Sequence, residues 1–445
     1  MLEAENAKAA PRGGSASAHA TLIKSQPAAS QSLGQSPAEV VLWFTEAVEI
    51  GFSKAYVTDA TGARWEAPNE GAFHVHTDPT NPGLIMQPGL PNGGYTVVWD
   101  VLSSVDGHRT KGFFTFFVGP PPLEPIDPSV PPVDLGSTSR PPEWLQVFSR
   151  WGSFASMAAL IGAVAFPFLV LPAAVSALRP SPASERAVRR VLRTARVSVL
   201  ASALALAVTA LLALWVQAWL ATGDSTSLQV IEDVRSGTRY GDIWTARILL
   251  AGGALAASVI VLIRGAQQWH ESIVHPSNTP WALLLLLAVG IPVTTSLNSH
   301  AAAGGSTDLE TIVDYVHLLA GGLWAGMLLQ LGLAIALAVP LLEERAPFLA
   351  ASVRRFSLIA LPAVGLIVAT GLVQSIDRLG ALDDIFDSEY GNKLAVKIVL
   401  LAPLILIAGF NLLLFGPRFL RMAKGSAQAA KERLPGWERA FRSAL

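Results

Sequence analysis

The chain has 445 residues, of which 51% are hydrophobic and only 15% are charged. Soluble proteins carry roughly a quarter of their residues as charges, so this composition argues against a wholly soluble protein. The formal net charge of -1 gives no reason to expect a nucleic-acid partner, which needs a basic face. The chain has no cysteine, so any metal must be held by nitrogen, oxygen or methionine sulfur, and disulfides are excluded.

Residues 1–18 are alanine-rich and polar, and they contain no apolar stretch long enough for the core of a signal peptide. The small residues Ala16-Ser17-Ala18 nevertheless have the form of a signal-peptidase site, directly before His19. We therefore expect residues 1–18 to be either a disordered tail or the remnant of a signal peptide. In the second case, cleavage would make His19 the N-terminal residue.

The next hundred residues alternate short segments rich in β-branched and aromatic residues with turn residues. These segments predict strands at 39–44, 54–58, 95–101 and 113–118. Such a pattern over residues 19–118 predicts a small all-β sandwich or Greek-key barrel. Residues 119–142 contain nine prolines, and this composition favours an extended spacer over a packed core.

From residue 143 to the end, apolar residues come in runs of the ~20 residues that a helix needs to cross a bilayer. Seven transmembrane helices are predicted, at 152–177, 198–221, 243–263, 281–298, 313–339, 356–376 and 394–416. Arg and Lys gather between the first and second runs, between the fifth and sixth, and in the C-terminal tail. The positive-inside rule assigns these parts to the cytoplasm. We therefore predict an all-α multi-pass bundle in a cytoplasmic membrane, with the β domain extracytoplasmic.

The helical part contains short internal matches. Tyr240-Gly241-Asp242 precedes the third run, and Tyr390-Gly391-Asn392 precedes the seventh. Parallel repeats of four helices would produce this spacing, and chance similarity is the alternative. If the repeats are real, the fourth run lacks a partner, and we expect an eighth helix to be missing after Leu445.

Ionisable side chains at membrane depth are costly and usually functional. Asp314 and His317 are spaced i, i+3 and share one face near the outer end of the fifth predicted helix, while His300 lies at the outer end of the fourth. Together with Arg247 and Lys397, they are candidates for lining an outward-facing path for a metal. In the alternative interpretation, the histidines form hydrogen bonds between helices, and Arg247 and Lys397 extend to lipid headgroups.

The β segment contains further candidates. Asp106 and His108 share one turn and could both reach a single metal, although an Asp-Gly pair is also favourable turn chemistry. His74 and His76 alternate along one face, so they could chelate a metal or simply occupy a surface strand. Met86 stands alone, which argues against a methionine-rich Cu(I) site. No glycine-rich phosphate loop is present, so we expect neither nucleotide binding nor ATP-driven pumping.

Two ordered sets of stretches carry a resemblance to known families. The first set is His19-Ala20-Thr21-Leu22, Ser25-Gln26-Pro27-Ala28, Leu42-Trp43-Phe44-Thr45-Glu46, Gly94-Tyr95-Thr96-Val97 and Ser104-Val105-Asp106-Gly107-His108. It resembles the CopC copper-binding domain over residues 19–118. The second set is Ser299-His300-Ala301, His317-Leu318-Leu319-Ala320-Gly321-Gly322-Leu323-Trp324, Thr370-Gly371, Tyr390-Gly391 with Lys397, and Asn411. It resembles CopD, so the chain resembles CopC–CopD fusions assigned to copper uptake across a bacterial inner membrane.

The resemblance implies a cupredoxin-like Greek-key domain that holds Cu(II) through an N-terminal histidine and a downstream Asp-x-His. The matching residues are His19, Asp106 and His108. Cu(II) favours tetragonal nitrogen and oxygen donors, and the terminal amine exists only if the chain is cleaved after Ala18. In the membrane part, the expected copper ligands are His300 and His317, supported by Asp314.

The leading hypothesis is a copper-binding membrane protein, not an enzyme, whose β domain captures Cu(II) and whose bundle passes copper inward for import, homeostasis or resistance. Its expected partners are the copper ion and the lipid bilayer. One alternative is a cytochrome-b-like electron-transfer protein with His300 and His317 as haem ligands. Another is a membrane-anchored copper scavenger or sensor that does not transport.

Overall fold

The computed structural model describes residues 20–68, 73–105, 107–120, 139–223, 227–267, 279–299, 308–343, 345–379 and a few positions between 391 and 403. The chain divides into two compact units. The first comprises Met1–Gly152, Val208–Leu249 and Val293–Ile312, and the second comprises Ser153–Ala207, Leu250–Pro292 and Val313–Leu445. The first unit therefore contains the β domain together with helical segments, and the second is entirely helical among its described residues.

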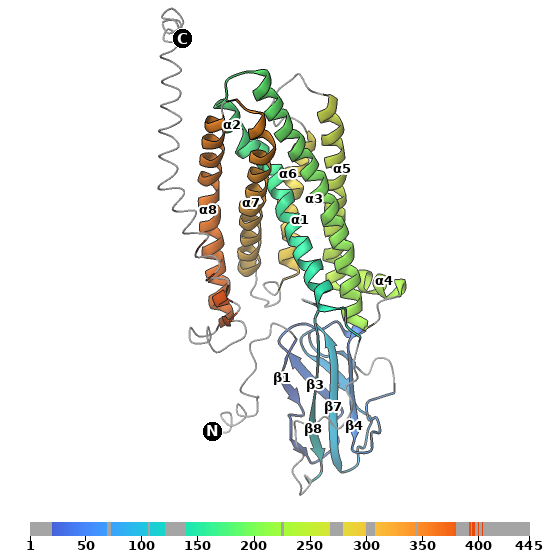
Figure 1. The fold of residues 1–445 in the computed structure, drawn as a ribbon. Coiled ribbons are helices and arrows are strands. Elements are labelled where there is room, and N and C mark those ends of the chain that lie inside the picture. Colours follow the sequence, from blue (N-terminus) through green and yellow to red (C-terminus); the bar gives the residue numbers. More distant parts are fainter. Residues whose placement is uncertain are drawn as a thin grey trace, which may run out of the picture. The chain divides into compact units, whose positions relative to one another are not determined.

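The β domain consists of two four-stranded sheets (Figure 1). One sheet has the order β1-β3-β6-β5, with β1 at Leu22–Gln26, β3 at Glu39–Phe44, β6 at Pro82–Ile85 and β5 at Phe73–Val75. The other has the order β2-β8-β7-β4, with β2 at Ser32–Leu33, β8 at Arg109–Val118, β7 at Gly93–Leu102 and β4 at Lys54–Asp59. Neighbouring strands are antiparallel except for β2 beside β8. The predicted all-β sandwich is confirmed, and its four predicted strands correspond to β3, β4, β7 and β8.

Alternation along the strands builds the core between the sheets. In β3, Val40, Leu42 and Phe44 are buried in the core, since every second side chain of a strand faces the same way. Tyr95 stacks on Phe116 across the β7–β8 pair, with ring centroids 5.6 Å apart. Each such buried apolar side chain stabilises the fold by about 1.5–3 kcal/mol. The sandwich is therefore a packed scaffold for the turns at its ends.

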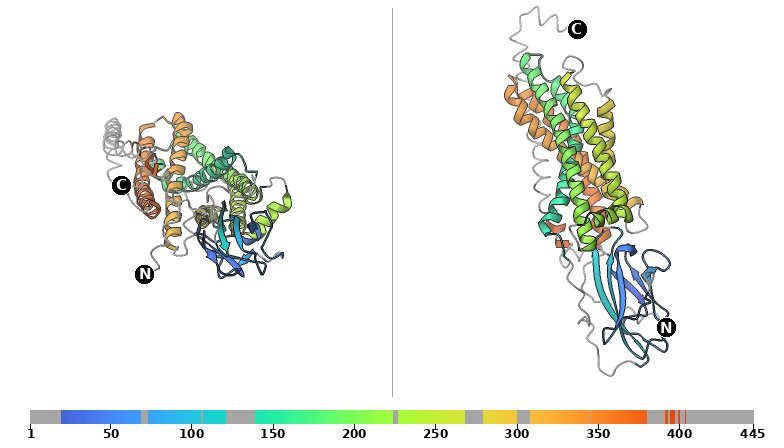
Figure 2. Two further views of the ribbon diagram at one scale, coloured as in Figure 1. Left: turned by 90° about the horizontal axis from the view of Figure 1, so that it is seen from below. Right: turned by 90° about the vertical axis from the view of Figure 1, so that its right-hand side faces the viewer.

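Six long helices follow, and they run alongside one another in Figure 1 and in the right-hand view of Figure 2. They are α1 at Glu143–Leu169, α3 at Pro182–Thr222, α5 at Arg239–Gln267, α6 at Thr279–Leu297, α7 at Asp308–Ala338 and α8 at Arg345–Leu379. The short helices α2 (Leu171–Ser176) and α4 (Leu228–Gly237) follow α1 and α3. In the described part of the chain, six helical segments are long and apolar enough to cross a membrane. These are the first six predicted spans, while the seventh, at 394–416, lies mostly outside the described residues.

The arginine-rich segment between the first two predicted spans is largely helical, although it lies outside both apolar runs. Helix α3 begins at Pro182, well before the apolar run, and carries Arg189 paired with Glu185 at 3.2 Å. Ser181 and Ser184 cap its first turn reciprocally through hydrogen bonds of 2.9 and 3.1 Å. A hydropathy window detects only the apolar part of a helix, but caps and helix-forming residues extend it further.

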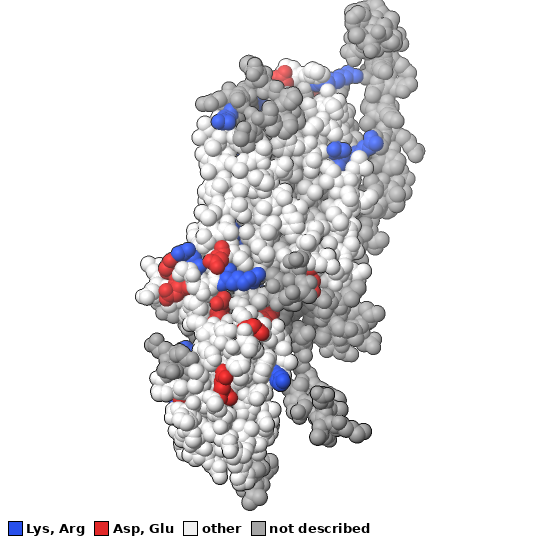
Figure 3. Space-filling view, turned by 180° about the vertical axis from the view of Figure 1, so that it is seen from behind, with Lys and Arg blue, Asp and Glu red and all other residues white. Residues whose placement is uncertain are grey.

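Figure 3 shows the surface of the molecule from behind. A broad belt of the helical part carries few charged side chains on this face.

Small residues bring α1 and α7 together in the second unit. A Cβ atom on Gly162 would lie 1.9 Å from the carbonyl carbon of Gly326, so the two backbones meet where neither residue has a side chain. Gly322 and Gly326 form a GxxxG pair, a spacing typical of close helix packing in membranes. This packing holds α7, which carries two of the predicted metal ligands.

Candidate metal sites

The turn between β7 and β8 closes on itself. The Ser103 N–H donates to the His108 carbonyl at 2.9 Å, and the Gly107 N–H donates to the Ser103 carbonyl at 3.1 Å. The Ser103 hydroxyl donates to the Glu46 carboxylate at 2.6 Å, and Glu46 is buried, with 5% of its surface exposed. A hydrogen bond to a buried carboxylate is stronger than a neutral one, so Glu46 fixes this turn to the chain after β3.

The start of β1 lies beside the first residues of β8. The Thr110 hydroxyl donates to the Ala20 carbonyl at 2.6 Å, and Ala20 is fully buried. Thr21 and Thr45 exchange two hydrogen bonds of 2.9 Å, one of them to the Thr45 hydroxyl. The backbone directly after His19 is therefore fixed next to the strand that begins one residue after His108. His19 itself lies outside the described residues, as does Asp106.

His108 contacts a cation from α1. Its Nε2 atom lies 3.0 Å from a guanidinium nitrogen of Arg150. A guanidinium can only donate, so Nε2 accepts this hydrogen bond with the lone pair that a metal would use. Arg150 and a metal bound through Nε2 would therefore compete for one nitrogen. The sequence reasoning missed Arg150, whose one signal was a charge at the edge of the first apolar run.

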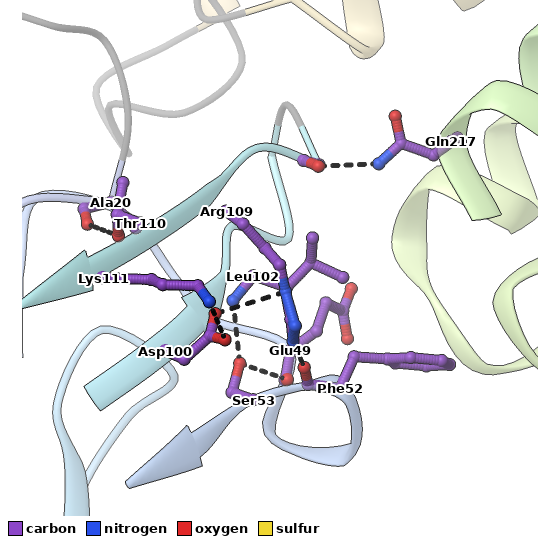
Figure 4. Close-up of polar contacts among 11 residues, drawn as sticks. Ala20, Glu49, Phe52, Ser53, Asp100, Leu102, Arg109, Thr110, Lys111 and Gln217 are labelled. Carbon is purple, nitrogen blue, oxygen red and sulfur yellow. Dashed lines mark hydrogen bonds and ion pairs between the residues drawn. The ribbon is translucent and has the colours of Figure 1, made fainter. Parts of the chain in front are cut away.

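Helix α3 reaches the same turn. The Gln217 side-chain amide donates to the Gly107 carbonyl at 2.7 Å, and Gln217 is 8% exposed (Figure 4). Gly107 has φ of +69°, which favours glycine, and a Cβ there would lie 1.9 Å from Gln217 Nε2 and would displace that amide. Leu102 of β7 packs in one apolar cluster with Leu214 of α3 and Trp244 of α5. The turn is therefore held by helices as well as by its own sheet.

A charged group supports the strands beneath the turn. Asp100 pairs with Arg109 Nε and Lys111 Nζ, each at 3.3 Å, and the Arg109 guanidinium also donates to the Phe52 carbonyl (Figure 4). Burial lowers the pKa of Arg109, and Asp100 opposes that shift. Burial also raises the pKa of Glu49, partly offset by the Arg239 N–H, which donates to its carboxylate at 3.1 Å. These pairs anchor the base of the turn without adding to the predicted ligands.

In the second unit, Asp314 and His317 both face α8. His317 Nδ1 lies 2.9 Å from the Thr370 hydroxyl, and the Asp314 carboxylate lies 3.5 Å from the Gln374 amide. The Thr370 hydroxyl donates to the Leu366 carbonyl at 2.5 Å, so it accepts from His317 Nδ1–H. The neutral ring then carries its lone pair on Nε2. The predicted shared face is confirmed, and His317 makes the interhelical hydrogen bond of the alternative interpretation.

The other membrane candidates have separate outcomes. Arg247 is 8% exposed and donates to Thr294 of α6, at 3.0 Å to the hydroxyl and 2.7 Å to the carbonyl. For Arg247, the alternative interpretation of an extension to lipid headgroups is therefore wrong, because Thr294 accepts hydrogen bonds from the guanidinium inside the protein. His300 and Lys397 lie outside the described residues.

A third group lies on the β1-β3-β6-β5 sheet. His74 Nε2 and His76 Nδ1 lie 3.2 and 3.1 Å from the same oxygen, Oε1 of Glu39. Within the described ranges, this is the one group of three or more potential ligands whose donor atoms all lie within 4.8 Å of one another. The alternation of His74 and His76 in the sequence pointed to these two residues. The pairing of β3 and β5 with β6 is what brings Glu39 beside them.

Three family models match successive parts of the chain. Residues 22–119 match the CopC domain, residues 141–311 match the copper resistance protein D-like N-terminal domain, and residues 350–440 match copper resistance protein D. The order is the one expected of a β domain fused to a membrane domain.

Relatives agree with these matches. The chain is 26% identical over 404 residues to the copper transport protein CutJ of Bacillus subtilis (strain 168), covering 89% of this chain and 68% of that protein. It is 38% identical over 101 residues to the protein YobA of Escherichia coli (strain K12), covering 23% of this chain and 79% of YobA. The crystal structure of CopC from Methylosinus trichosporium OB3b aligns with 24% of this chain and all of its own length, at 30% identity and a TM-score of 0.20. This multi-pass membrane protein therefore belongs to the family of CopC–CopD fusions, the copper resistance and copper transport proteins.

Proposed function

We propose that this protein captures Cu(II) outside the cytoplasmic membrane and mediates copper import or homeostasis through its helices. In this proposal residues 19–118 form the copper domain, 119–142 the spacer and 143–445 the membrane domain. One observation carries it: the described neighbours of all three predicted ligands converge. Ala20, which follows His19, accepts a hydrogen bond from Thr110 at 2.6 Å, two residues beyond His108. Gly107, which follows Asp106, lies in the closed turn beside His108.

The chemistry of the three residues suits Cu(II). Cleavage after Ala18 would give His19 a terminal amine beside its imidazole, and the two would chelate one ion. Asp106 would add a carboxylate oxygen and His108 a second imidazole. Nitrogen and oxygen donors in a tetragonal arrangement are what Cu(II) prefers.

Arg150 gives the site a means of release. Its guanidinium occupies Nε2 of His108 at 3.0 Å in the structure, so a copper ion bound through Nε2 displaces that hydrogen bond. The positive charge also opposes a second cation nearby. Arg150 therefore lowers the affinity of the site and favours handing copper on rather than storing it.

The next stage in the proposal is the polar face between α7 and α8. Asp314 and His317 would receive copper there together with His300, and Thr370 orients the His317 ring through its 2.9 Å hydrogen bond to Nδ1. The hydrogen bond to Nδ1 would present Nε2 as the ligand nitrogen, as groups that hydrogen-bond the other ring nitrogen of a metal-bound histidine do. The distribution of Arg and Lys supports the orientation in this proposal, with the β domain outside and the C-terminal tail in the cytoplasm.

The first test is a Cu(II) titration with electron paramagnetic resonance on the full chain in detergent, prepared with its N-terminus at His19. The chain extended back to Met1 and a His108→Ala variant are the controls. We expect one tightly bound ion with nitrogen hyperfine structure that is weakened in both controls. Equal Cu(II) binding by all three proteins would overturn the site. A Soret absorption band in the purified protein would instead favour the haem alternative.

A further inference from the structure

We propose that Glu39, His74 and His76 form a second metal site, for a divalent first-row transition-metal ion, on the outer face of the β1-β3-β6-β5 sheet. Both histidine nitrogens point to Glu39 Oε1, at 3.2 Å from His74 Nε2 and 3.1 Å from His76 Nδ1. The three potential donor atoms lie within 4.8 Å of one another, close enough to bind a single ion. The site does not depend on the copper site proposed above.

The strand register brings these residues together on one face. Gly83 of β6 pairs with His74 on one side and with Val41 on the other, and Glu39 precedes Val41 by two residues. Residues two apart on a strand share a face, so Glu39 and His74 flank Gly83 on the side away from the core. The opposite face carries Leu84, which is 1% exposed in the core cluster. The register therefore gives the site a position set by three strands.

Gly83 leaves the space that the Glu39 carboxylate occupies. A Cβ on Gly83 would lie 1.8 Å from Glu39 Oε1 and 3.3 Å from the His74 ring carbon Cε1. Any other residue at this position would push the carboxylate away from the two imidazoles. The carboxylate is thus seated between the strands beside both histidines.

Two imidazoles and one carboxylate form a ligand set for Zn(II), Cu(II) or Ni(II). Three protein ligands leave at least one position for water, and the side chains of His74, His76 and Glu39 are 34%, 36% and 25% exposed. An ion can therefore enter from solvent and exchange. Among the divalent first-row metal ions, a site with nitrogen and oxygen ligands has its highest affinity for Cu(II). We therefore expect Cu(II) to bind more tightly than Zn(II).

The two sites lie at opposite ends of β3. Glu39 is its first residue, whereas Leu22 at the start of β1 pairs with Phe44 at its end, and Ala20 lies beyond Leu22. A six-residue strand spans roughly 17 Å at about 3.3 Å per residue. One ion cannot bridge that distance, so the sites load independently.

The test measures bound Cu(II) and Zn(II) by equilibrium dialysis and elemental analysis of the full chain in detergent. The variants are the double change His74→Gln with His76→Gln, Glu39→Gln and Gly83→Ala. We expect the double variant to lose one ion per chain and the other two to bind that ion about tenfold more weakly, a loss within the range seen when groups around a metal are removed. Val75→Thr, between the histidines on the same strand, is the matched control and should bind as the wild type does.

Wild-type stoichiometry and affinity in the double variant and in Glu39→Gln, for both metals, would overturn the second site. Thermal unfolding of each variant shows whether it is folded, and Gly83→Ala tests the geometry with every ligand still present. His108→Ala separates this proposal from the first. Loss of an ion in His108→Ala alone supports only the copper site, and loss in the double variant alone supports only the second site.

Discussion

At the scale of single residues, the site chemistry depends on side chains that orient others. Thr370 determines which nitrogen of His317 carries the proton, Glu46 holds the turn of His108, and Arg150 occupies the His108 ring nitrogen at 3.0 Å. None of these three is a predicted ligand. Each acts through a hydrogen bond whose direction is fixed by what its partner can donate or accept.

Replacing Arg150 should tighten copper binding in the β domain. In Arg150→Gln the cationic competitor for His108 Nε2 is gone, so we expect the dissociation constant for Cu(II) to fall about tenfold, the equivalent of ~1.4 kcal/mol. Competition titration against a copper chelator measures the change, and Arg140→Gln is the charge-matched control. An unchanged or weaker affinity in Arg150→Gln would show that copper does not use this nitrogen.

Asp59 provides a prediction about pH. Hydrogen bonds from the Thr61 hydroxyl at 2.6 Å and the Trp65 indole at 2.9 Å lower its pKa from 3.8 to about 2. Because this pKa is lower in the folded than in the unfolded state, the ionised carboxylate stabilises the fold above pH 3.8. This contribution is lost as the pH falls toward 2. The difference in unfolding temperature between wild type and Asp59→Asn should therefore shrink between pH 5 and pH 2. A constant difference over that range would contradict the assignment.

At the scale of elements, pairing and packing set the geometry. Strand β7 pairs with β8 from Gly93 to Leu102, so the register of the two strands fixes where the turn that joins them begins and ends. In the helices, glycine allows a close approach of α1 and α7: a Cβ on Gly326 would lie 1.9 Å from the Ala158 carbonyl oxygen. Helix packing without a solvent-driven hydrophobic effect relies on such contacts.

Two glycines of α7 should therefore respond in opposite ways to alanine. Gly326→Ala forces α1 and α7 apart, and overpacking of this kind costs about 1–3 kcal/mol. A Cβ on Gly332 meets no atom within 4 Å, so Gly332→Ala should be neutral or stabilise by about 1 kcal/mol through helix propensity. Thermal unfolding in detergent distinguishes them. Equal shifts for both variants would mean that the α1–α7 contact is not a close one.

At the scale of the whole molecule, the chain carries a match to the CopC domain followed by matches to the two copper resistance protein D models. The proposed function requires both parts to act in sequence. The scavenger alternative requires the helices only as an anchor. A variant in the second unit separates these two possibilities.

We expect His317→Ala to lower copper uptake into cells or proteoliposomes severalfold while leaving Cu(II) binding by the β domain unchanged. The reason is that His317 supplies a ligand nitrogen along the proposed path and lies in the second unit. Copper uptake is measured by the accumulation of a radioactive copper isotope or by a copper-responsive fluorescent probe. Tyr315→Phe, on the same helix, removes only a hydroxyl that donates to the Val289 carbonyl at 3.2 Å and serves as the control. Wild-type uptake by His317→Ala would favour the scavenger.

Much of the architecture followed from the order of residues alone. A run of β-branched and aromatic residues predicted β3 with its observed bounds, and turn residues marked the ends of β4, β7 and β8 to within a few residues. Apolar runs predicted six described helices because about 20 apolar residues are what a bilayer requires. These features depend on neighbours along the chain, and so local sequence carries them.

The tertiary structure decided which distant residues meet. Strand pairing brought Glu39 beside His74, and helix ends brought Arg150 to His108 and Gln217 to Gly107. No periodicity encodes such contacts, since each depends on register and packing between segments far apart in the chain. The start of α3 ahead of its apolar run has a different and local cause, because the Ser181–Ser184 cap, which a hydropathy pattern does not detect, sets where the helix begins. The sequence thus pointed to candidate metal ligands by residue type, and the fold determined which side chains lie beside them.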